Sequence, residues 1–144
     1  MSSDLEWLLI RNFNSFKVKR VPEGPIFSTE PGNLRNIHSS KYSGLANSKV
    51  IGVTDRNGAI TISTRKTSGP SHGASGATVH TQIRRKSGPR RVARAASNNA
   101  RRGYRPDLRK SVLARASALL AAQKEKKASP PKKVRGKKAH AASA

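Results

Sequence analysis

The sequence predicts an α+β fold: a small mixed N-terminal domain of strands and short helices, followed by basic helical extensions and a disordered Lys-rich tail. Three observations predict it: apolar alternation around an Asn-Gly pair, two segments that favour helices, and a strong asymmetry of charge. The 144 residues suffice for one small domain plus extensions. We expect a domain over 1–65, a flexible linker over 66–80, a basic extension over 81–123 and a tail over 124–144.

The first predicted element is a short helix over residues 4–12. Ser3 and Glu6 have the spacing of a capping box, and leucines follow at helical intervals. Trp7 lies in this apolar segment, so we expect its side chain in the core.

Four short strands are expected next. Phe16 and Val18 alternate with lysines, and residues 26–29 return after a Pro-Gly turn. Residues 49–54 and 59–64 form a second pair, separated by a turn that contains Asn57 and Gly58. Asn-Gly readily adopts the positive φ angles of a tight turn, so this is the best hairpin signal in the chain.

The rest of the chain favours helices separated by small and polar residues. Residues 67–78 consist mostly of Ser, Gly, Thr, Ala and Pro, which is typical of a flexible connector and lacks the ending of a phosphate-binding loop. Ala93, Ala95 and Ala96 permit a helix that Gly103 could end. The strongest helix runs from Pro106 through Gln123, with its apolar stripe at Leu108, Val112, Ala116, Leu119 and Leu120. Two basic residues, Lys110 and Arg115, fall away from the centre of that stripe.

The charge indicates a polyanionic partner. The chain holds 30 Lys+Arg against 7 Asp+Glu, a formal net charge of +23. Residues 1–63 hold 8 basic and 5 acidic residues, whereas residues 64–144 hold 22 basic and 2 acidic residues. So much positive charge exceeds what solubility requires, and phosphates that bind Lys and Arg release counterions. We therefore expect nucleic-acid binding, with Arg fitted to folded RNA and the Lys-rich tail following phosphates.

The expected RNA-binding residues are the basic side chains of each segment and one tyrosine that can stack on a base. In the N-terminal domain and at its end they are Arg11, Lys17, Lys19, Arg20, Lys41, Arg65 and Lys66. In the extension they are Arg84, Arg85, Lys86, Arg90, Arg91, Arg94, Arg101, Arg102, Tyr104, Arg105, Arg109, Lys110 and Arg115. In the tail they are Lys132, Lys133, Arg135, Lys137 and Lys138.

Several classes of function find no support in the residues. There is no cysteine, and the four histidines lack metal-ligand spacing, so we expect no metal and no cofactor. No nucleophile elbow or paired-carboxylate candidate is evident, so we expect no enzymatic activity and no small-molecule substrate. No apolar run approaches the roughly 18 residues of a membrane span, and the last helix lacks the Trp and Phe of an interfacial anchor, so no membrane partner is expected.

Three blocks of sequence resemble a known family. The first consists of Trp7, Arg11-Asn12, Ser15-Phe16 and Lys19-Arg20. The second is Phe27 to Leu34 with Tyr42–Leu45 and Val50–Val53, and the third is Tyr104 to Arg109 with Arg115–Ala118. In this order they are similar to the eukaryotic large-subunit ribosomal protein family numbered twenty-eight. The resemblance covers most of residues 5–63 and 104–124, whereas residues 65–103 are similar only in being basic. It implies a structural component of the large (60S) subunit that binds ribosomal RNA, with no catalytic role.

Under this interpretation the partners are ribosomal RNA of the large subunit and neighbouring ribosomal proteins, and no homo-oligomer is expected. The protein would act in translation on cytoplasmic ribosomes after nuclear or nucleolar assembly. Two alternatives stay open. A ribosome-assembly factor shares a related N-terminal domain, and a linker-histone-like chromatin protein would share the Lys-Ala-Pro composition of the tail around Ser129.

Overall fold

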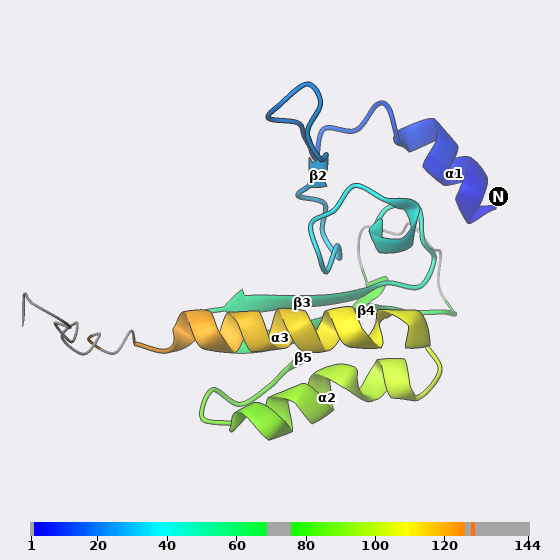
Figure 1. Cartoon of the computed structure of the whole chain (residues 1–144). Coiled ribbons are helices and arrows are strands. Elements are labelled where there is room, and N and C mark those ends of the chain that lie inside the picture. The colour runs from blue at the N-terminus through cyan, green and yellow to red at the C-terminus, as the bar shows by residue number, and fades with distance from the viewer. Residues whose placement is uncertain (1, 69–75, 126–127, 129–144) are drawn as a thin grey trace, which may run out of the picture.

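The computed structural model describes residues 2–68, 76–125 and 128, and it has the expected α+β architecture (Figure 1). Helix α1 spans Ser3–Ile10 and is followed by the two-residue strands β1 (Lys17–Val18) and β2 (Phe27–Ser28). Strands β3 (Ile51–Arg56), β4 (Ala59–Arg65) and β5 (Thr78–Gln82) precede helices α2 (Pro89–Arg101) and α3 (Arg109–Gln123). Two 3₁₀ turns, Ser40–Tyr42 and Pro106–Leu108, complete the elements.

The main sheet is antiparallel, in the order β3-β4-β5. The predicted hairpin is confirmed: Arg56 pairs with Ala59, and Asn57 and Gly58 between them have φ angles of 52° and 75°. Asparagine and glycine tolerate these positive angles better than other residues, so the sequence sets the turn.

Strand β5 corrects the expected limits of the linker and the helical extension. Residues 78–80 were expected in a flexible connector and residues 81–82 in a helical segment, but together they pair with β4 from Thr61↔Gln82 to Arg65↔Thr78. All five side chains of β5 are exposed. A strand without a buried face has no apolar alternation, which is why its sequence resembles a connector.

The core lies between the sheet and the two long helices. Helix α3 packs on the sheet beside β3, and α2 packs along α3 (Figure 1). Alternate strand positions supply Ile51, Val53, Ile60 and Ile62, and the predicted stripe of α3 supplies Leu108, Val112 and Ala116. The stripe is confirmed, with Leu119 and Leu120 partly buried beside it. Apolar residues from both sides of residue 65 share this core, whereas the division of the chain into domains stays a prediction.

Helix α1 and the β1–β2 hairpin lie apart from this core (Figure 1). The N-cap of α1 is Ser2, whose hydroxyl accepts from the amide of Asp4 at 3.3 Å, rather than the predicted Ser3. The expectation that Trp7 belongs to the core is wrong. Its ring is half-buried against His38, with the ring centroids 4.8 Å apart, and no residue of α1 is buried. Leu5, Leu8 and Leu9, whose spacing predicted a buried face, are exposed because no other described element packs against them.

A compact loop over residues 29–50 connects the hairpin to the sheet. At its centre Glu30 is buried, and its carboxylate accepts from Ser43 Oγ at 2.9 Å and from Asn33 Nδ2 at 3.2 Å. A side chain at Gly44 would collide with the carbonyl oxygen of Pro31, so only glycine lets the two ends of the loop pack together. This loop stands beside the polar face of the sheet.

Candidate RNA interface

Helix α2 is built to present arginines on one side. Gly88 precedes it, and Pro89 suits its first turn because the amide that proline lacks would be unpaired there. Val92, Ala96 and Ala100 are buried at helical spacing. Arg90, Arg94 and Arg101, four and seven residues apart, therefore project from nearly the opposite side, and all three are exposed.

The basic segment continues at both ends of α2. We call residues 84–102 the α2 basic surface; it contains no Asp or Glu. Its cations are all exposed: Arg84, Arg85, Lys86, Arg90, Arg91, Arg94, Arg101 and Arg102. Only Arg85 among them has a hydrogen bond from its side chain to another residue within the described ranges, donating from Nη2 to the carbonyl oxygen of Asn57 at the β3–β4 turn. The surface is thus a cluster of guanidinium and ammonium groups available to phosphate oxygens.

Tyr104 and Arg105, both expected to contact RNA, form hydrogen bonds within the protein. The guanidinium of Arg105 donates to the carbonyl oxygens of Lys49 and Lys41 at 2.9 Å each and forms an ion pair with Asp107 at 2.9 Å. Hydrogen bonding from Arg105 lowers the pKa of Asp107. The hydroxyl of Tyr104 donates to the carbonyl oxygen of Arg65 at 2.5 Å and accepts from the amide of Val50 at 3.2 Å.

Both residues therefore connect the segment before α3 to the loop and sheet. A side chain already saturated by backbone oxygens has few donors left for phosphate. RNA contacts by Tyr104 and Arg105 stay predictions, and their internal bonds weigh against them.

A second cationic cluster surrounds Tyr42. The guanidinium of Arg35 and the ammonium of Lys41 lie 5.8 and 5.9 Å from the centre of its ring. The hydroxyl of Ser111 donates to Tyr42 Oη at 3.4 Å. This hydrogen bond first, and then Arg35, lower the pKa of Tyr42. The predictions included Lys41 but not Arg35, because nothing in the sequence places Arg35 beside the ring.

The remaining expected contacts on α3 and the N-terminal half are scattered. Arg109 and Lys110 are exposed in the first turn of α3, whereas Arg115 is half-buried, and its Nε is buried without a hydrogen-bond partner. Exposed cations also lie after α1, after β1 and at the end of β4; they are Arg11, Lys19, Arg20 and Lys66. Lys17 is half-buried in β1. The tail residues Lys132, Lys133, Arg135, Lys137 and Lys138 lie outside the described residues.

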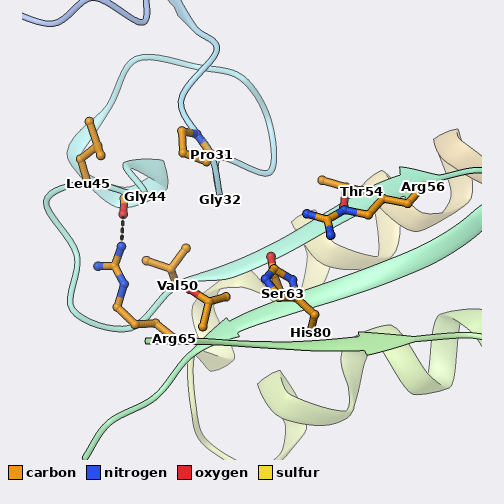
Figure 2. A pocket seen from close by; sticks show the side chains of 11 residues that line it. Pro31, Gly32, Gly44, Leu45, Val50, Thr54, Arg56, Ser63, Arg65 and His80 are labelled. Atoms are coloured by element: carbon orange, nitrogen blue, oxygen red, sulfur yellow. Dashed lines mark hydrogen bonds between the residues drawn. The ribbon is translucent and has the colours of Figure 1, made fainter. Parts of the chain in front are cut away.

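The sheet carries a polar face whose residues, apart from Arg65, are not among the predicted RNA-binding residues (Figure 2). Alternation turns Thr54, Arg56 and Ser63 away from the helices, together with Arg65, Thr78 and His80. Figure 2 shows the labelled side chains of this face on the side of the sheet toward the loop that carries Pro31, Gly44 and Leu45. Sheet and loop enclose a hollow of about 250 Å³. The alternation of side chains along the strand before the Asn57-Gly58 turn could have placed Arg56 on this face. The position of His80 could not be predicted, because nothing in the sequence indicates strand β5.

The described ranges contain no group of three His, Asp or Glu side chains arranged to hold a metal ion. Among the described helices, none is both long enough and apolar enough to cross a membrane.

Comparisons with known proteins identify relatives over most of the chain. The model of the ribosomal L28e protein family matches residues 5–122, and so includes residues 65–103, whose resemblance by sequence is one of charge alone. The chain is 36% identical over 130 residues to the large ribosomal subunit protein eL28 of Schizosaccharomyces pombe, covering 88% of this chain and 96% of the relative. It is 34% identical over 138 residues to the eL28 protein of Dictyostelium discoideum, covering 94% and 98%.

The eL28 protein of Caenorhabditis elegans matches over a shorter stretch, 41% identical over 69 residues, which is 48% of this chain and 55% of the relative. The two longer matches cover 88% and 94% of the chain, and the family model extends from α1 to the last turn of α3. Together they establish that this chain belongs to the ribosomal L28e protein family: it is a ribosomal protein, a structural constituent of the ribosome and not an enzyme.

Proposed function

We propose that the protein is a structural constituent of the large ribosomal subunit that binds and stabilises folded ribosomal RNA by neutralising phosphates during cytoplasmic translation. The observation that carries the proposal is the α2 basic surface, with eight exposed cations in residues 84–102 and no carboxylate among them. Phosphates of packed RNA helices repel one another. Lys and Arg side chains placed between them release counterions and reduce that repulsion.

The geometry of the surface favours recognition of RNA shape and backbone over base sequence. Arg90, Arg94 and Arg101 share one side of a helix that is fixed to the core by its opposite side. Guanidinium groups bind phosphate oxygens with two parallel hydrogen bonds, so their positions favour particular phosphate spacings. Side chains cannot read the base edges in the deep, narrow major groove of A-form RNA, so such a helix contacts mainly phosphates and sugars.

The N-terminal helix supports a protein partner as well. Leu5, Leu8 and Leu9 are 48%, 58% and 63% exposed on α1, and Phe13 after it is 89% exposed. The helix contains Asp4 and Glu6 and no basic residue, in a chain of net charge +23. Phosphates would repel these carboxylates and offer nothing to the leucines.

We infer that this apolar face of α1 docks in an apolar groove of a neighbouring ribosomal protein whose rim is basic. A second copy of this chain would bring the same acidic helix against it, which disfavours a homo-oligomer. To test this, Leu8→Glu should release the chain from purified large subunits at a lower salt concentration than the unaltered chain needs. Its matched control is Val79→Glu, which is 42% exposed on β5 and lies outside α1. Equal release of the unaltered chain and Leu8→Glu would refute the docking surface.

The main proposal is tested by sedimentation of a tagged chain through a sucrose gradient at about 0.5 M salt, where screened contacts weaken. We expect the chain in large subunits, whole ribosomes and polysomes. Restriction to nuclear precursor particles would favour the assembly factor. Recovery on chromatin alone would overturn the proposal and favour the linker-histone-like alternative.

A further inference from the structure

The polar face of the β3-β4-β5 sheet forms the floor of a groove whose opposite wall is the loop before β3. Thr54 and Arg56 on β3, Ser63 and Arg65 on β4, and Thr78 and His80 on β5 all lie on this floor. The wall consists of Pro31, Gly32, Gly44 and Leu45, with Val50 at one end (Figure 2). Floor and wall thus differ in character: hydroxyl groups and cations face apolar side chains and glycine backbone.

The groove is held open by glycines and by an arginine. Gly32 has a φ angle of +87°, and a side chain there would approach Val50 Cγ1 to 2.5 Å. At Gly52 a side chain would collide with the hydroxyl of Ser63. Arg65 ties the floor to the wall, because its Nη1 donates to the carbonyl oxygen of Asn47 at 2.6 Å and its Nη2 to that of Gly44 at 2.8 Å. The hollow is therefore a formed feature of the fold.

The charge of the groove points to an anion. Its lining includes Arg56 and Arg65, a histidine at position 80, and no Asp or Glu. The guanidinium of Arg56 is exposed, and within the described residues it has no hydrogen bond or ion pair. Arg65 is fixed by the wall, so Arg56 is the cation free to meet a phosphate at the open end.

The size and the remaining chemistry narrow the ligand further. The hollow of about 250 Å³ is smaller than the roughly 300–1,000 Å³ of pockets for drug-sized molecules. It therefore suits a small part of a larger ligand, such as one base of an RNA chain. Hydroxyl groups of Thr54, Ser63 and Thr78 can each donate and accept, as base edges require. Proline and leucine on the opposite wall offer an apolar surface to the face of a base. Proteins read RNA sequence mainly on unpaired nucleotides whose bases are turned out of the helix.

We propose that this groove binds one unpaired nucleotide of ribosomal RNA, with its base between the sheet floor and the Pro31–Leu45 wall and its phosphate at Arg56. The inference rests on the proposed function, since it assumes that the partner is ribosomal RNA. It adds a site that reads a single nucleotide to a protein whose other contacts are with the RNA backbone.

The test compares two variants of the same strand. Thr78→Phe fills the groove, whereas Thr81→Phe places the same side chain on the opposite face of β5, where the position is also exposed. Large subunits carrying each full-length chain are purified, and their ribosomal RNA is probed with reagents for base edges and ribose 2′-hydroxyls. We expect one unpaired nucleotide to become several-fold more reactive with Thr78→Phe and to stay protected with Thr81→Phe.

A second measurement needs no variant. Large subunits with the unaltered chain are irradiated with ultraviolet light, digested, and searched by mass spectrometry for peptides that carry a nucleotide. An adduct within Thr54–Arg56 or Thr78–Gln82 supports the groove. This measurement decides the matter if Thr78→Phe fails to enter subunits.

The outcomes separate the two proposals. If the unaltered chain does not sediment with large subunits, the proposed function and the groove both fall. If it sediments, but adducts form only in the α2 basic surface and no nucleotide distinguishes the variants, the groove proposal alone is overturned.

Discussion

The triple substitution Arg90→Gln, Arg94→Gln and Arg101→Gln tests whether α2 contacts phosphate. These three guanidinium groups are exposed, share one side of the helix, and have no ion pair within the described ranges. Each duplex phosphate contact releases about 0.9 counterion. At a salt concentration of about 0.15 M, that release contributes roughly 1 kcal/mol per contact.

If all three arginines contact phosphate, the variant should lose about 3 kcal/mol of binding free energy, which is roughly a hundredfold in Kd. The slope of log Kobs against log salt should become less negative by about 2.7. Fluorescence anisotropy with deproteinised large-subunit ribosomal RNA at several salt concentrations measures both quantities.

Two controls make this prediction sharp. Glutamine has nearly the helix propensity of arginine, so unfolding of α2 is not expected, and circular dichroism checks this. The matched variant with lysine at all three positions keeps the charge, so its salt slope should equal that of the unaltered chain, while its affinity falls only where a forked hydrogen bond is lost. An unchanged slope in the glutamine variant, with the fold intact, would refute α2 as an RNA anchor.

Three further predictions concern the fold that positions this surface. Val112 is fully buried between α3 and the sheet, so Val112→Ala should reduce the free energy of unfolding by about 2–3 kcal/mol in urea titrations. A reduction below about 0.5 kcal/mol would contradict the described core. Gly44→Ala should destabilise the chain by about 1–3 kcal/mol because its new methyl group meets the carbonyl of Pro31. Gly88→Ala meets no atom within 4 Å and should cost less, only the weaker capping of α2 by alanine; equal effects would argue against the close packing of the loop. Asp107→Asn should cost less than about 1 kcal/mol at neutral pH, because the carboxylate side chain is 38% exposed. Because the folded-state pKa of Asp107 is lowered, the loss of stability in Asp107→Asn should be present above the ordinary carboxyl pKa. It should vanish as the pH falls through the folded-state pKa. If acid titrations show a loss of stability that does not depend on pH, the ion pair with Arg105 is not the cause of that loss.

The sequence alone determined those features that local chemistry sets. Asn57 and Gly58 fix the hairpin because they tolerate positive φ, and the 3.6-residue spacing of Leu108, Val112 and Ala116 fixes the buried side of α3. The sequence alone also shows the net charge and its concentration in residues 64–144. It shows the residue blocks of the L28e family as well. Each of these depends on neighbours within a few residues or on composition.

The tertiary structure decided which cations are available and where an unpaired nucleotide could bind. By sequence, Arg105 and Arg94 are equally good candidates for phosphate contacts. In the structure the guanidinium of Arg105 donates to the backbone oxygens of Lys41 and Lys49, whereas Arg94 is exposed. Strand β5 has no buried face, so pairing with β4 rather than its own residues makes it a strand. His80 reaches the groove only through that pairing. Hydrogen-bond partners that lie tens of residues away leave no periodic signal in a sequence, and they determine this interface.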